Sequence, residues 1–158
     1  NMYVISEDPA GKLMLTNKTI KNNLKTWIDQ YRMLNDTIDI LDPYIINIGI
    51  SFQIRTSSNS EKYEILRECN NALIEKYNTK FFIGEPFYIT DVYKTLNSIS
   101  GVSDVIAVSI HNRDGANYSS NSLNINQNMS PDGTYLATPK NAILEIQFPI
   151  TDIRGTVT

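Results

Sequence analysis

Cysteine and histidine occur once each in this 158-residue sequence, as Cys69 and His111. A single cysteine excludes an internal disulfide, so a reducing compartment is the simpler interpretation. The two residues also fall short of the four nitrogen or sulfur ligands that a structural zinc ion needs. A nucleophile–base pair of the Cys–His type would have to join Cys69 to His111. Because Cys69 falls on the apolar side of a predicted helix, a packed thiol is the better interpretation. We therefore expect no enzyme activity, no metal ion and no cofactor.

Positive charge is in deficit, with 14 Lys and Arg against 17 Asp and Glu. Binding to nucleic acid or to an anionic membrane surface relies on clustered basic residues, so we expect neither partner. No apolar run approaches the length of a membrane-spanning helix, and no signal-peptide pattern is present. The sequence begins Asn-Met-Tyr-Val-Ile, which is typical of the interior of a longer chain, and we expect a fragment.

Glycine is sparse and isolated, so the sequence contains no phosphate-cradling loop. The carboxylates of Asp36, Asp39 and Asp42 are the nearest thing to a cation site. Apolar residues interrupt this run and it holds no glycine, unlike a calcium loop. A solvated edge is therefore the expected role of these aspartates.

The clearest structural signal is a strand over residues 44–55, which Asp42-Pro43 introduces. Large apolar residues occupy every second position of this segment, and the positions between them are mostly polar. This period of two, with one polar face, favours an antiparallel sheet that is covered on one side. A shorter strand is expected over residues 2–5, followed by a turn at residues 8–11.

Three helices are predicted around this strand. The first covers residues 18–34, and its expected buried stripe is Ile20, Leu24, Trp27, Ile28, Tyr31 and Leu34. The second covers residues 60–77, opens with capping-box spacing at residues 58–61, and should bury Ile65, Leu66, Cys69, Ala72, Leu73 and Tyr77. The third is short. Thr90 is its expected cap and Gly101 lies just beyond its end, before a strand that reaches Ile110.

Residues 116–141 form an excursion that is rich in Asn and Ser and separates two predicted strands, the second over residues 142–149. Such a long connection is either an arm that contacts a partner or a disordered loop. We expect its scattered apolar side chains to be exposed on a lone domain and to serve as interface anchors. The candidate interface residues are Tyr118, Leu123, Ile125, Met129 and Tyr135, together with Gln53 and Arg55 on the polar face of the main strand.

The elements together predict a single α+β domain, in which an antiparallel or mixed sheet carries helices packed mainly on one face. Their order is similar to that of the baseplate J-like family of contractile phage tails, and more narrowly to the C-terminal region of its wedge proteins. The residues that carry the resemblance are Tyr3, Val4 and Gly11, the first helix over 24–31, Asp42-Pro43-Tyr44 with Ile46, Ile48 and Ile50, residues 83–86, residues 89–91 and residues 99–105. The excursion departs from the shorter connections expected in simpler members.

This resemblance implies a structural subunit of the virion, assembled in the host bacterial cytoplasm. The partners it implies are further copies of the same chain, as a homodimer or a ring contact, and other baseplate wedge subunits. Two alternatives from other classes remain. One is a regulatory domain that binds a small molecule, since two-layer folds host many functions. The other, by analogy alone, is an acyl-phosphate hydrolase that uses Arg55 and a nearby Asn.

Overall fold

The fold is organised around one long strand, β5 (Tyr44–Thr56), in a computed structural model that describes residues 1–57 and 61–158. Asp42 and Pro43 precede this strand. Proline fixes its own φ and holds the residue before it extended, so the chain enters β5 in an extended conformation. The side chains on one face are fully buried. They are Ile46, Ile48, Ile50, Phe52 and Ile54. The predicted strand over residues 44–55 is therefore confirmed.

Three strands pair with β5 and make the sheet mixed. The strand β7 (Val102–Asn112) runs antiparallel along one edge. Along the other edge, β9 (Ala142–Glu145) and β10 (Ile153–Val157) both run parallel to it. Asn47 pairs with Glu145 and Ile50 pairs with Ile153, so seven residues of the edge chain (146–152) lie beside only two residues of β5 (48 and 49). The surplus forms a short helix, α5 (Pro149–Asp152), that bulges from the edge. The predicted strand over residues 142–149 thus ends early, at Glu145, and Pro149 lies at the start of this helix.

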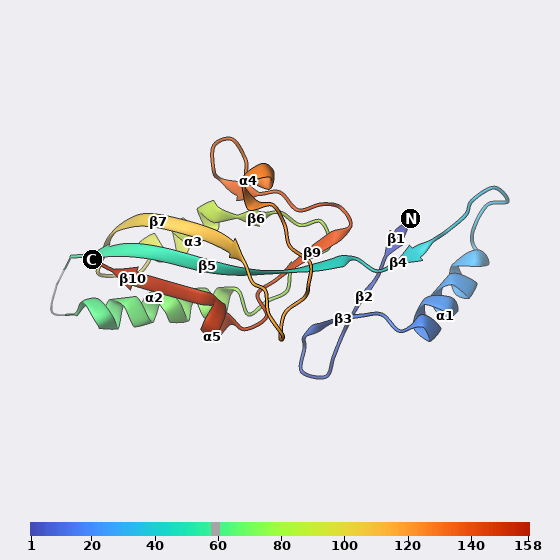
Figure 1. The fold of residues 1–158 in the computed structure, drawn as a ribbon, viewed down its shortest axis with the longest axis horizontal. Helices are drawn as coiled ribbons and strands as arrows, with labels where there is room; N and C mark the ends of the chain where they lie inside the picture. The colour runs from blue at the N-terminus through green and yellow to red at the C-terminus, as the bar shows by residue number, and fades with distance from the viewer. Residues whose placement is uncertain (58–60) are drawn as a thin grey trace.

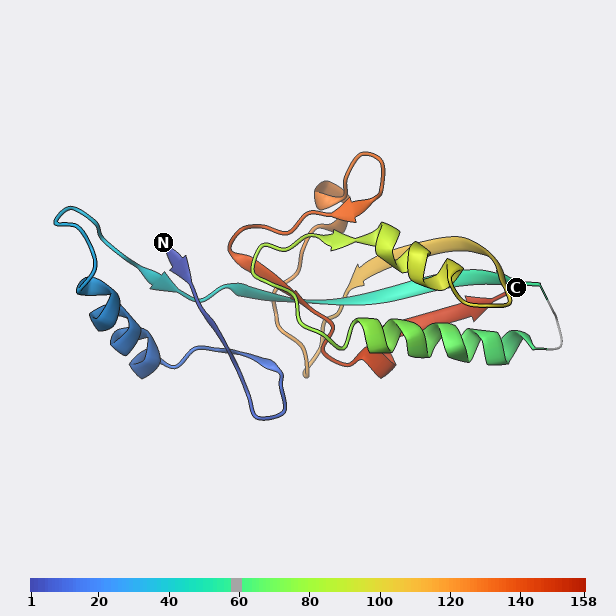
Figure 2. The same ribbon diagram turned by 180° about the vertical axis from the view of Figure 1, so that it is seen from behind.

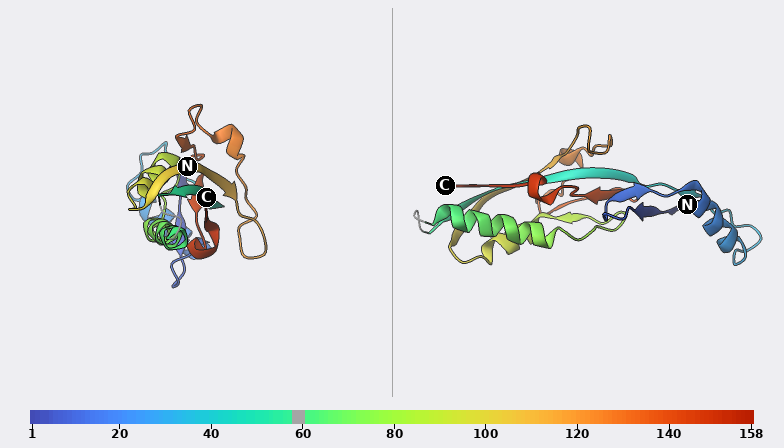
Figure 3. Two further views of the ribbon diagram at one scale, coloured as in Figure 1. Left: turned by 90° about the vertical axis from the view of Figure 1, so that its left-hand side faces the viewer. Right: turned by 90° about the horizontal axis from the view of Figure 1, so that it is seen from below.

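Two helices cover one face of the sheet. Figure 3 shows α2 (Lys62–Lys76) and α3 (Ile89–Asn97) beneath the strands. On the opposite face the end of β5 that holds Asn47 is covered, and the end that holds Gln53 and Arg55 is open. Two glycines allow the helices and strands to pack this closely, because glycine has no Cβ. A Cβ on Gly155 would lie 2.3 Å from the ring of Phe52, and a Cβ on Gly101 would lie 2.6 Å from Ile65. The chain is therefore an α+β fold, with 28% helix and 32% strand.

The helix predictions succeed for α2 and partly for α3. Ile65, Cys69 and Leu73 are buried on α2 as expected. The predicted capping box spans residues 58–61, of which residues 58–60 lie outside the described residues. Its last position is wrong, because Glu61 is the N-cap of α2 rather than the third residue of the helix. The predicted cap of α3 is wrong. Tyr88 occupies the N-cap position, and Thr90 lies inside the first turn. Gly101 has a φ of 92°, which confirms the left-handed position expected there.

Residues 1–43 form a projecting unit that we call the arm. In it, β1 (Met2–Tyr3) pairs with β4 (Ile40–Leu41), and β2 (Ile5–Glu7) forms a hairpin with β3 (Leu13–Leu15). The helix α1 (Lys18–Asp29) lies at the far end. Figures 1 and 2 show the arm extending from one end of the sheet, with β4 leading directly into β5.

The prediction for α1 is wrong in two respects. The helix ends at Asp29 rather than at residue 34, and none of its residues is buried. Periodicity identifies which side chains share a helix face, but it does not tell what covers that face. In a single copy of the chain this apolar face remains open.

The excursion is ordered and contains secondary structure of its own. It includes the short helix α4 (Ile125–Asn128) and the strand β8 (Tyr135–Leu136). The latter pairs with β6 (Phe87–Tyr88), just before α3. Among the described residues, no helix combines the length and hydrophobicity that crossing a membrane requires.

Candidate interaction surface

Exposed apolar side chains are concentrated at the N-terminal end of the chain. Ten of the sixteen large hydrophobic residues that stand exposed in the described part lie within residues 1–44. Conversely, the first side chain of the hydrophobic core, in chain order, is Ile46. Apart from Pro43, the arm therefore has almost no apolar interior of its own. A concentration of exposed apolar side chains of this kind is typical of an interaction site.

The C-terminal half of α1 and the turn after it carry the most exposed of these residues. Trp27 is 58% exposed, Tyr31 is 72% exposed, and their rings lie 5.0 Å apart. Met33 and Leu34 follow in the turn and are more exposed still. We call these four residues the apolar ridge. Lys21, which forms an ion pair with Asp42, ties the helix to the rest of the arm.

The ridge is held by local contacts rather than by a core. The side-chain oxygen of Asn17 caps α1 by accepting a hydrogen bond from the Thr19 N–H at 2.9 Å. At the other end, Arg32 pairs with Asp29 at 3.0 Å and donates to the carbonyl of Asp36. These contacts fix where the ridge points without covering it.

A second apolar feature is concave. Eight residues from the hairpin of the arm, the loop after α2 and β9 line a groove of about 540 Å³: Ile5, Glu7, Leu13, Lys80, Phe81, Phe82, Ile83 and Ile143. We call it the hairpin groove. Its only charged residues, Glu7 and Lys80, pair with each other. Phe82 lies at its rim with most of its side chain exposed.

Polar contacts hold the hairpin of the arm against the sheet. The Leu13 N–H donates to a carboxylate oxygen of Glu145 at 3.1 Å, and the other oxygen accepts from the side-chain amide of Asn47 at 3.0 Å. The ammonium of Lys12 lies 4.0 Å from the ring centroid of Phe148, in cation–π range. Because Asn47 and Glu145 are opposed on β5 and β9, the sheet itself positions the hairpin.

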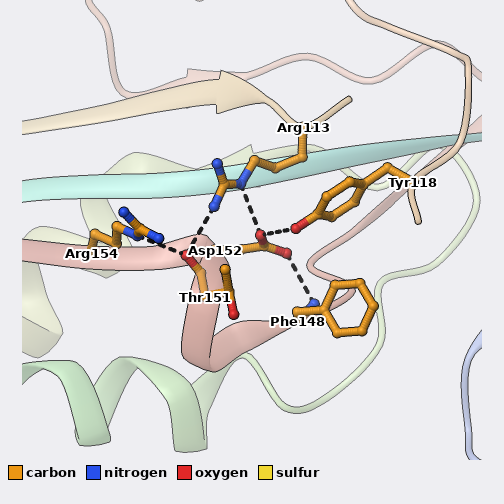
Figure 4. A network of polar contacts seen from close by, with 6 residues as sticks. All are labelled: Arg113, Tyr118, Phe148, Thr151, Asp152 and Arg154. Atoms are coloured by element: carbon orange, nitrogen blue, oxygen red, sulfur yellow. Dashed lines mark hydrogen bonds and ion pairs between the residues drawn. The ribbon is translucent and has the colours of Figure 1, made fainter. Parts of the chain in front are cut away.

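A buried polar network centres on Asp152. This residue is 1% exposed, and its carboxylate accepts from Arg113 Nε at 2.8 Å, from the Tyr118 hydroxyl at 2.6 Å and from the Phe148 N–H at 3.0 Å (Figure 4). Burial, and next the hydrogen bond to Asp152, raise the pKa of Tyr118. The network joins the end of β7, the excursion and α5. Both carboxylate oxygens of Asp152 already accept hydrogen bonds, so we assign the network a structural role.

Asparagine side chains fix the remainder of the excursion. Asn47 Oδ1 accepts from the Ser119 N–H at 2.7 Å, and Asn121 donates to the carbonyl of Ile45. Asn112 bonds both the N–H and the carbonyl of Leu123. The Asn- and Ser-rich composition of the excursion suggested a partner-contacting or a disordered segment. Instead, its Asn121 and Ser130 also supply side-chain partners for backbone groups that form no regular ladder.

The candidate interface residues of the excursion are consequently less exposed than expected. Leu123 is 7% exposed and belongs to the core, while Ile125 and Met129 pack against that core. Tyr118 is held by Asp152. The expectation that these side chains are exposed on a lone domain is wrong, because α4 folds back onto the sheet. Tyr135 alone keeps an exposed ring, beside that of Tyr88.

Gln53 and Arg55 lie on the open face of the sheet, as predicted. Gln53 belongs to a shallow depression of about 240 Å³ that Ser51, Phe52, Ala107, Ser109, Arg154 and Thr156 complete. Arg55 is exposed, lies opposite Asp104 on β7, and does not line this depression. The two residues therefore share a polar, solvated surface that is separate from the arm.

Cys69 and His111 lie on opposite sides of the sheet. Cys69 is buried between α2 and the strands, and burial raises its pKa from 9.0 to about 11. His111 follows the buried Ile110 on β7, so its ring points to the other face, where it packs against Gly49. Burial, and then the charge of Arg113, lower the pKa of His111. A protonated thiol that is separated from the imidazole by the sheet is not an activated nucleophile.

The other titratable side chains with shifted pKa values have structural surroundings. Within residues 1–57 and 61–158, no three His, Cys, Asp or Glu side chains are grouped so as to hold a metal ion. Hydrogen bonds from Ser130 and Thr134 lower the pKa of Asp132, which organises the turn before β8. Burial raises the pKa of Tyr77, whose ring packs against those of Phe81 and Phe87 and whose hydroxyl is buried without a hydrogen-bond partner among the described residues.

The sequence prediction missed the arm as a surface. Its signal was available, since the apolar stripe of α1 was recognised, but the stripe was assigned to the core.

Neither a protein-family model nor a curated protein sequence matches this chain. Inference about its function therefore depends on its own residues and geometry.

Proposed function

We propose that this chain is a structural subunit of the tail baseplate of a contractile-tailed phage, which acts by self-association and by binding neighbouring baseplate proteins. The observation that carries the proposal is the arm. Its residues are ordered, yet they bury almost no apolar side chains. The assignment to a baseplate comes from the order of motifs in the sequence, and the virion is accordingly the proposed location.

The energetics of the arm favour an assembly. Fixing the backbone costs roughly 1–2 kcal/mol per residue, which a domain normally offsets by burying apolar surface. An isolated helix of the length of α1, 12 residues, is marginal in water. A partner that covers the apolar ridge would supply the missing burial. A solvated monomer gives no comparable compensation.

The molar mass of the full chain in solution, measured by sedimentation over a wide concentration range, tests self-association. The chain offers a matched pair of variants, because Tyr31 on the arm and Tyr63 on α2 are both 72% exposed. Tyr31→Ser should weaken association by at least about 5-fold, the effect of losing an interface anchor, whereas Tyr63→Ser should not. A strict monomer at the highest concentration, or equal effects of the two variants, would contradict the proposal.

Mass spectrometry of purified tails from the phage that encodes the chain tests the assignment to a baseplate. The chain should be present in amounts comparable to those of other baseplate proteins. If the chain forms an oligomer in solution but is absent from the tail, self-association is supported and the baseplate role is contradicted.

One observation favours the regulatory alternative. The hairpin groove has the volume and apolar lining of a small-molecule site. A ligand that fills it should raise the melting temperature of the chain in proportion to the logarithm of its concentration.

A further inference from the structure

The chain carries two unfilled apolar features of opposite shape. The apolar ridge is convex and consists of Trp27, Tyr31, Met33 and Leu34. The hairpin groove is concave and lies between the arm hairpin and the loop that holds Phe82. Both features leave large apolar side chains in water in a single copy, so each offers burial to the other.

One copy cannot bring its ridge into its own groove. Only Thr16 and Asn17 separate β3 from α1, and β3 contributes Leu13 to the groove. The helix is therefore bound closely to the end of the hairpin. Figures 1 and 2 show α1 beyond the hairpin, on the far side of the arm from the loop that joins α2 to β6. The ridge of a second copy is not subject to this restriction.

We propose that the apolar ridge of one copy docks into the hairpin groove of a second copy. This inference rests on the proposed function, of which it specifies the self-contact. The ridge and the groove are different surfaces, so the contact is heterologous. Each copy then uses its ridge on one neighbour and its groove on the other, and the assembly grows head to tail into a closed ring or an open filament.

The exposed area is adequate for such a contact. Fully buried aromatic side chains each contribute about 150–250 Å², so Trp27 and Tyr31 alone expose roughly 250 Å². Met33 and Leu34 are more exposed than either ring and add to this apolar surface. The four side chains would form the apolar centre of the contact, and the surface around them would supply the remainder of the ~800 Å² that each partner buries in a standard interface.

The charges beside the two surfaces do not oppose docking. Glu7 pairs with Lys80 in the groove, and Asp29 pairs with Arg32 beside the ridge. Each charge already has an opposite partner within its own chain. Apolar contact between copies therefore need not leave one of these charges buried without a partner, which is the costly case.

Disulfide trapping between two single-cysteine-substituted chains tests the contact. Full-length Tyr31→Cys and Phe82→Cys variants, one of them isotopically labelled, are mixed and oxidised. The native Cys69 is buried with a raised pKa, so its background reaction is low. The matched control replaces Tyr31→Cys by Tyr63→Cys, since both tyrosines are equally exposed.

The expected result is a mixed disulfide between positions 31 and 82 of different copies, at least about 10-fold more abundant than the control product. If the main product is a symmetric dimer joined through position 31 of both copies, the inference is overturned, and the arms of two copies pair with two-fold symmetry instead. Trapping no better than the control, in a chain that sediments as an oligomer, would overturn this contact but not the proposed function. A monomer that shows no trapping would overturn both.

Discussion

Replacing Asp152 by alanine is the sharpest test of how the excursion is held in place. The substitution removes the acceptor for three donors at once: Arg113 Nε, the Tyr118 hydroxyl and the Phe148 N–H. Asp152 is 1% exposed, so water does not readily replace its carboxylate. The guanidinium of Arg113 would remain next to a small cavity, without its ion-pair partner.

The expected destabilisation follows from these contacts. Removing one partner of a buried ion pair costs about 3–5 kcal/mol. Arg113 is partly solvated and keeps its bond to the carbonyl of Thr151, which lowers the cost. We therefore expect Asp152→Ala to lose about 2–4 kcal/mol of the free energy of unfolding. For a chain of this size, that loss lowers the melting temperature by roughly 4–16 °C.

Urea unfolding, followed by circular dichroism, measures this change. Asp114→Ala is the matched control because it removes the same charge from an exposed turn next to Arg113, and it should stay within about 0.5 kcal/mol of wild type. Tyr118→Phe should cost about 1–2 kcal/mol, and combined with Asp152→Ala it should be less than additive, since the two groups share one bond. A loss below 0.5 kcal/mol for Asp152→Ala would refute the reasoning.

Two other predictions concern the core. Gly155→Ala should destabilise the chain by about 1–3 kcal/mol in the same urea assay, because the new Cβ would lie 2.3 Å from Phe52; wild-type stability would mean that β10 and the ring separate without cost. The thiol of Cys69 should not react with a disulfide reagent at pH 8 in the folded chain and should react once urea unfolds it. Folding raises the pKa of Cys69 from 9.0 to about 11. The contribution of this thiol to the free energy of unfolding is therefore complete below pH 9 and is lost as the pH rises towards 11. Rapid labelling of the native chain would contradict both the low reactivity and this pH dependence.

The sheet and the body helices could be predicted because their signals are local. The strand β5 alternates apolar and polar residues strictly enough that its extent and its buried face follow from sequence alone. Cys69 and its neighbours on α2 repeat at helical spacing, and Gly101 occupies a backbone position that other residues reach only with strain. In each case the residues that determine the structure are adjacent in the chain.

The excursion could not be predicted in the same way. Its Asn and Ser residues have the composition of a disordered segment, but their partners are distant in sequence. Asn47 is 72 residues from Ser119, and Tyr118 is 34 residues from Asp152. Only the folded sheet brings those groups together. Leu123 is buried for the same reason, although its local sequence suggests exposure.

The candidate site shows the same division. The amphipathic pattern of α1 is a property of the sequence, and it correctly groups Trp27 and Tyr31 on one side. Whether that side faces a core depends on where β4 and the hairpin place the helix, and they place it beyond the end of the sheet. The sequence by itself thus determined the elements and their apolar faces, through local spacing. Tertiary structure alone decided which faces are covered, because covering requires contacts between residues far apart in the chain.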